Sequence, residues 1–153
     1  MKKILLGLFL FCSISLSAQI VEVEKQKWEK VGEVKPGGIS LISSIDVIKD
    51  KGKDGTNLYL WIYSNAAYRT ISDVKSFEFS ASESDFNGLY DMLKTLISGP
   101  KGVEKQIVLG KTSVSFKSMR ALGVSSLVVM DLSSSGFFYL SSKQLDKLFG
   151  KTE

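Results

Sequence analysis

Three aromatic residues at strand spacing are the strongest candidates for binding chemistry in this sequence. Tyr59, Trp61 and Tyr63 stand at every second position of the apolar segment 58–63. In a strand, their rings would form a row on one face, about 7 Å apart. Such a row can stack on sugars or on the bases of single-stranded nucleic acid. Strands that lie between others are normally covered, which favours a core position for the row. Tyr59, Trp61 and Tyr63 are the candidate ligand-binding residues if this face is open.

The other face of the same segment is aliphatic. It carries Leu58, Leu60 and Ile62. If helices pack on one face of the strand while the other stays open, these three residues are the better core candidates, and the aromatic row is then the exposed face.

The residues needed for the commonest catalytic and metal chemistry are missing. The chain has no histidine, and its single cysteine is Cys12 near the amino terminus. Ser-His-Asp and Cys-His catalysis, and zinc, haem or iron–sulfur sites with His or Cys ligands, all require these residues. We therefore expect a non-enzymatic protein with no catalytic residues, no metal site and no cofactor. A hydrolase that uses carboxylates or a Ser-Lys pair is the remaining enzymatic alternative.

Two segments resemble binding loops but lack required residues. Asp50, Asp54 and Gly55 resemble the start of a calcium loop, which needs an oxygen ligand where this chain has Gly52. Gly110 and the two residues after it resemble the end of a phosphate-binding loop, which also needs a glycine five residues earlier. We expect a hairpin turn at Asp54 and Gly55, and a strand with a bulge at Gly110.

The amino-terminal residues have the order of a secretory signal. Lys2 and Lys3 precede the apolar run 4–11, and small residues follow up to Ala18. The run is too short to span a bilayer, which takes about 20 residues. We expect cleavage near Ala18, export to the periplasm or out of the cell, and one mature domain over residues 19–153 without a transmembrane segment.

A repeated pattern predicts the fold. Residues 79–90 align without gaps with residues 138–149, and each copy is typical of a strand end, a serine helix cap and an amphipathic helix. The matched pairs are Phe79/Phe138, Ser82/Ser141, Phe86/Leu145, Leu89/Leu148 and Tyr90/Phe149. We predict an α+β fold in which an antiparallel sheet and two helices form two related strands-then-helix halves, about 19–100 and 101–153, with pseudo-two-fold symmetry.

Local signals also mark where both helices end. Gly99 and Pro100 predict the end of the first helix through a left-handed glycine cap, and Gly150 predicts the end of the second. Ser141 and Gln144 predict a capping box at the start of the second helix. Each helix therefore has a predicted start and a predicted end.

The inferred element order is similar to the Whirly type of single-stranded nucleic-acid-binding fold, in which two sheet-plus-helix halves pack with pseudo-two-fold symmetry. The resemblance covers most of the mature chain and depends on the element order and on the Phe79/Phe138 and Ser82/Ser141 matches. No diagnostic motif matches residue by residue. The resemblance therefore implies the duplicated architecture and assigns no binding residues.

These observations together favour an exported binding domain without enzymatic activity, whose partner is a ligand such as a carbohydrate or a protein. Binding of single-stranded nucleic acid through the sheet face is the alternative. Export counts against nucleic acid, and so does the charge. Removal of the signal lowers the formal net charge from +4 to +2, which is too small for a basic footprint.

Overall fold

The computed structural model describes residues 27–35, 45–52, 54–68 and 73–151. The secretory signal expected over residues 1–18, with its cleavage near Ala18, lies outside them. Four strands and a helix occur twice, which confirms the predicted α+β class with two strands-then-helix halves. The elements in chain order are β1 (Glu29–Val34), β2 (Ile45–Lys51), β3 (Thr56–Ser64), β4 (Val74–Ser82), α1 (Glu83–Ser98), β5 (Glu104–Leu109), β6 (Thr112–Ala121), β7 (Val124–Asp131), β8 (Gly136–Ser141) and α2 (Ser142–Leu148).

Each group of four strands forms its own antiparallel sheet, with every strand beside its neighbour in the chain. The first sheet has the order β1-β2-β3-β4 and the second has the order β5-β6-β7-β8. The predicted turn at Asp54 and Gly55 is confirmed, with Gly55 at φ +74°. The predicted bulge at Gly110 is wrong. Gly110, at φ +60°, and Lys111 instead form the two-residue turn between β5 and β6, where glycine meets the need for a positive φ.

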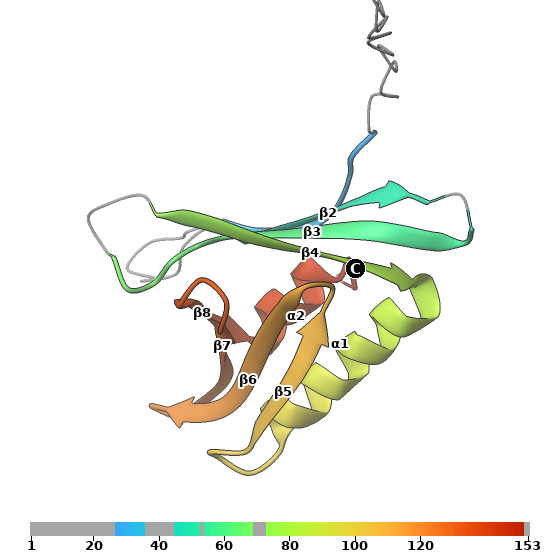
Figure 1. Ribbon diagram of the computed structural model, residues 1–153. Coiled ribbons are helices and arrows are strands. Elements are labelled where there is room, and N and C mark those ends of the chain that lie inside the picture. Colours follow the sequence, from blue (N-terminus) through green and yellow to red (C-terminus); the bar gives the residue numbers. More distant parts are fainter. Residues whose placement is uncertain (1–26, 36–44, 53, 69–72, 152–153) are drawn as a thin grey trace, which may run out of the picture.

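The two helices are exchanged between the halves. Helix α1 follows β4 in the chain but also packs against β6 and β7, and α2 follows β8 but packs against β1 and β2. Figure 1 shows the first sheet as one layer, with both helices and the second sheet on the same side of it. The helices meet where Lys94 of α1 pairs with Asp146 of α2 at 2.8 Å. The hydroxyl of Tyr90 donates to the same carboxylate at 2.8 Å.

The space between the first sheet and the rest of the molecule is filled by aromatic side chains. Tyr59, Trp61 and Tyr63 are 1%, 0% and 0% exposed. Val47 of β2 and Phe77 of β4 pair with Trp61 in the sheet and are buried on the same face. Contacts from both halves therefore close over this face, and large rings fill the gap.

The aliphatic face of β3 points the other way. Leu58, Leu60 and Ile62 are half-buried on the outer face of the first sheet. The alternative in which these three residues form the core side of an otherwise open strand is wrong. The physical reason is packing between the halves, because the rings of β3 contact Phe138 and Phe149 of the second half on the inner face.

The repeat defines equivalent helix starts, as predicted. Ser82 caps α1 by accepting the amide of Asp85 at 3.0 Å. Ser141 caps α2 in a complete capping box, since Gln144 Oε1 accepts the Ser141 amide at 2.8 Å while the Gln144 amide donates to Ser141 Oγ at 3.4 Å. The repeated apolar residues are buried in the core: Phe79, Phe138, Phe86, Leu145, Leu89, Leu148 and Phe149.

The predicted helix ends are confirmed in position, but one differs in conformation. Helix α1 ends at Ser98, yet Gly99 is extended (φ −77°, ψ −173°) rather than left-handed. The proline ring at Pro100 favours this extended backbone in the residue before it. Gly150, after α2, does adopt a positive φ of +64°.

Candidate functional site

The aromatic row that the sequence singles out is part of the core. A stacking platform needs open ring faces, but here the rings contact one another and the second half. Trp61 lies 6.1 Å from Phe138 and 5.8 Å from Phe149 between ring centroids, and Tyr63 lies 4.7 Å from Phe138. The favoured core position of Tyr59, Trp61 and Tyr63 therefore describes the row, and the exposed platform considered beside it is not formed. Tyr59 also lines a pocket.

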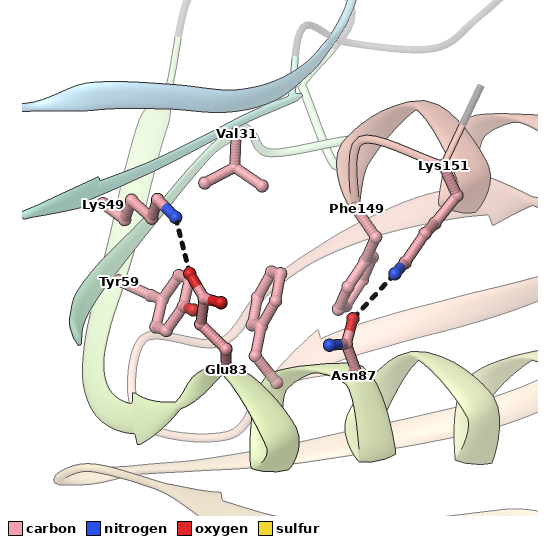
Figure 2. A pocket seen from close by; sticks show the side chains of 8 residues that line it. Val31, Lys49, Tyr59, Glu83, Asn87, Phe149 and Lys151 are labelled. Atoms are coloured by element: carbon pink, nitrogen blue, oxygen red, sulfur yellow. Dashed lines mark hydrogen bonds and ion pairs between the residues drawn. The ribbon is translucent and has the colours of Figure 1, made fainter. Parts of the chain in front are cut away.

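That pocket lies where the two halves meet. It has a volume of about 210 Å³ and is lined from β1, β2, β3, α1 and the chain end after α2. Figure 2 shows its polar side chains around an apolar floor. The lining residues are Val31, Lys49, Tyr59, Glu83, Phe86, Asn87, Phe149 and Lys151.

The floor of the pocket is a stack of three rings. The rings of Tyr59 and Phe86 are 4.1 Å apart and nearly parallel, at 5°. Phe86 stacks in turn on Phe149 at 4.4 Å and 26°. Rings fixed on both sides by such contacts lose little freedom when a ligand arrives, so the floor is preorganised.

The rim of the pocket carries more positive than negative charge. Lys49 Nζ lies 3.1 Å from Glu83 Oε1, and Lys151 Nζ donates to Asn87 Oδ1 at 2.8 Å. The lining therefore holds two ammonium groups and one carboxylate, and only Lys49 is paired with that carboxylate. The side chain of Lys49 is 23% exposed, whereas that of Glu83 is 69% exposed. The lysine is held in place while its partner stands largely in water.

Sequence reasoning missed most of this site. Tyr59 is the only pocket residue that it proposes for binding. Phe86 and Phe149 are predicted as core residues, which they are, and Lys49, Asn87 and Lys151 form no motif because they come from separate segments. No spacing in the chain brings these lysines together; only the packing of α2 against β1 does.

A second polar cluster surrounds a buried carboxylate. Asp131 is 3% exposed and accepts the hydroxyls of Tyr63 at 3.1 Å and Ser134 at 2.6 Å. Its other oxygen accepts the backbone amides of Ser133 and Ser134 at 2.9 and 3.1 Å. Burial, together with the negative charge of Asp131, raises the pKa of Tyr63 to about 12. These groups satisfy one another and tie β3 to the turn after β7.

This cluster predicts a loss of stability in alkali. An unfolded tyrosine ionises near pH 10, before the folded Tyr63 does. The contribution of the protonated Tyr63 hydroxyl to the free energy of unfolding is therefore complete below pH 10 and is lost as the pH rises towards 12. The loss corresponds to about 3 kcal/mol. Urea unfolding at several pH values should show the stability difference between wild type and Tyr63→Phe shrinking by this amount, because all other titrations are shared.

The control for this prediction is Tyr68→Phe, since Tyr68 is 55% exposed. This variant measures the effect of losing an exposed tyrosine hydroxyl under the same conditions. A constant difference for Tyr63→Phe would contradict the prediction. It would mean that the Tyr63 hydroxyl ionises equally easily in the folded and unfolded chains.

Comparison with protein-family models, curated proteins and solved structures finds no match to the chain. Within the described residues, no three His, Cys, Asp or Glu side chains are grouped to hold a metal ion. No described helix is long and apolar enough to cross a membrane. The pocket of about 210 Å³ is thus the candidate site that the geometry itself defines.

Proposed function

We propose that the chain is a non-catalytic binding domain that takes a small, negatively charged ligand with a short apolar body in this pocket. One observation carries the proposal: two lysines and only one carboxylate line a pocket whose floor is a stack of rings. The volume of about 210 Å³ is below the roughly 300 Å³ at which pockets for drug-sized ligands begin. A short organic acid, a sugar acid or one acidic side chain of a protein partner fits this description.

The Lys49–Glu83 pair is suited to exchange for a ligand. An ion pair at the surface contributes only about 0–1 kcal/mol, so little is lost when Glu83 turns into solvent. A ligand anion can then take the place of its carboxylate on Lys49, which is the less exposed partner. Lys151 approaches from the other side of the pocket (Figure 2). The apolar part of the ligand contacts Val31 and Phe86 in the lining.

Export of this binding domain is part of the proposal and is supported by the signal pattern of residues 1–18. The repeated order of four strands and a helix supports the resemblance to the Whirly type as a proposal about architecture alone. The nucleic-acid alternative loses its basis, because burial of the aromatic row leaves no open rings on β3 for bases to stack on.

Titration with small carboxylates, sulfonates and neutral amides of matched size, followed by NMR, tests the proposal. We expect the anions to shift the resonances of Asn87 and Lys151, and the amides to leave them unchanged. Lys49→Met should weaken anion binding about tenfold, since a hydrogen bond to a charged group contributes about 1.5–3 kcal/mol. Glu83→Gln should strengthen binding, because it removes the competing carboxylate.

The matched control is Lys105→Met. Lys105 is an exposed lysine of β5 outside the pocket, so this change removes the same charge without touching the site. Equal weakening by Lys49→Met and Lys105→Met would show a non-specific charge effect and overturn the proposed site. Chemical conversion of a bound ligand would overturn the non-catalytic assignment.

A further inference from the structure

The turn between β6 and β7 has an unusual residue at its apex. Leu122 and Gly123 connect the strands with positive φ angles of 50° and 77°. Turns of this kind favour Asn, Asp or Gly at both positions, because a side chain with a Cβ is strained there. Leu122 is nevertheless fully exposed, at 104%. The Leu122 side chain therefore does not contribute to the core, and glycine at this position would form the turn with less strain.

The apolar character extends beyond the apex. Ala121 and Val124 form the last strand pair before the turn, and Val124 is 58% exposed. Figure 1 shows the arrowhead of β6 pointing away from the first sheet, so this end of the hairpin projects from the molecule. We call Ala121, Leu122, Gly123 and Val124 the hairpin tip.

Positive charges lie behind the hairpin tip. Arg120 pairs with Ser125 one step back along the strands, and its Nε donates to the Ser125 hydroxyl at 3.2 Å. Lys101 lies in the turn between α1 and β5, where the next residue, Gly102, donates its amide to the carbonyl of Ser118 on β6. Both cations are exposed, and neither forms an ion pair within the described part of the chain.

A third cation lies at the same end of the second sheet. Ser141, where β8 ends, pairs with Ser126 of β7, two residues from the hairpin tip. The start of α2, with the exposed Lys143, therefore lies on this side. The negative charge of Glu104 on β5 is offset by Lys117, whose Nζ lies 3.9 Å from its carboxylate.

We propose that the hairpin tip inserts into the surface of an anionic lipid bilayer. The proposal depends on the order of side chains along the hairpin. Apolar side chains form the apex, and the first cation lies one residue further back along the strands, where each residue spans about 3.3 Å. An interfacial segment buries its apolar part about 5–10 Å into the boundary of headgroups and acyl chains. Arg120, Lys101 and Lys143 would then lie near the phosphates, which attract juxtamembrane cations. This surface is separate from the ligand pocket.

Layering of this kind favours a bilayer over a protein cleft. A cleft of fixed shape would need polar partners placed for each cation, whereas lipid headgroups adjust to whatever charges stand behind the apex. One apolar hairpin and three cations give weak, reversible attachment, since stable anchoring needs stronger signals. Attachment should therefore depend on salt, because screening is strong above about 0.1 M.

Co-sedimentation of the full chain with vesicles tests this proposal. Vesicles of phosphatidylcholine with about 30% phosphatidylglycerol are compared with pure phosphatidylcholine, because the surface potential that attracts cations comes from anionic lipid. We expect binding to the anionic vesicles that falls as salt is raised. Leu122→Gly should reduce that binding about tenfold while the melting temperature stays equal or rises, since glycine fits the positive φ.

Leu132→Ala is the matched control. Leu132 is 46% exposed but lies at the other end of the second sheet, where its amide bonds to the carbonyl of Ser113. This variant should bind the anionic vesicles like wild type. The apolar run 4–11 is common to every variant, so comparison between them isolates the hairpin tip. Equal binding to both kinds of vesicle, full binding by Leu122→Gly, or capture of a protein instead of vesicles would overturn the proposal.

Discussion

Replacement of Trp61 by alanine is expected to lower the free energy of unfolding by about 3–5 kcal/mol, the range for loss of a large buried aromatic side chain. Trp61 is 0% exposed, and its neighbours Phe77, Phe138 and Phe149 come from both halves. Its indole nitrogen has no hydrogen-bond partner among the described residues, so the loss comes from packing alone. Urea denaturation followed by circular dichroism measures it.

The other tryptophan provides the control for this prediction. Trp28 precedes β1 and is 36% exposed, so Trp28→Ala should cost less than about 1 kcal/mol. Similar small losses for both variants would contradict the core position of Trp61. They would restore the interpretation of Tyr59, Trp61 and Tyr63 as an accessible row.

Gly32→Ala is expected to be nearly as severe, at about 3 kcal/mol or more, although it adds only one methyl group. A Cβ at Gly32 would overlap the carbonyl oxygens of Lys147 and Leu148, which are backbone atoms of α2. A flexible side chain could move aside, but a helix cannot move without losing its other contacts. β1 must therefore separate from α2. Thermal and urea unfolding of the variant measure the effect.

A second glycine is expected to show the opposite effect on stability when it is replaced by alanine. Gly88 lies within α1, and a Cβ there meets nothing within 4 Å. Gly88→Ala should stabilise the protein by about 0.5–1 kcal/mol, the difference in helix propensity between the two residues. An equal effect from both substitutions would mean that the close approach of β1 to α2 is absent in solution.

The local parts of the fold can be predicted from sequence because their signals are local. The caps at Ser82 and Ser141 and the apolar rhythm that follows each of them need no knowledge of the rest of the chain. The conformation of Gly99 shows the limit of such local signals. The helix ends where expected, but Pro100 favours an extended backbone at Gly99 rather than the left-handed cap.

The buried side of β3 cannot be predicted in this way. The strand is apolar on both faces, so its alternation does not show which face is covered. The choice depends on the volume between the halves, where Trp61 meets Phe138 and Phe149 from residues far along the chain. The pocket is unpredictable for the same reason, since Lys49 and Lys151 become neighbours only after both helices have packed.

The exchange of helices between the halves has a consequence for how the chain becomes folded. β1 and α2 are the first and last described elements, and they pack on each other. A nascent chain that lacks α2 leaves the inner face of β1 and β2 without its cover, so the first half cannot mature while the second is still being synthesised. Contacts between distant segments are slow to form because a long loop must close first. The last described helix therefore completes the core that the first described strand began.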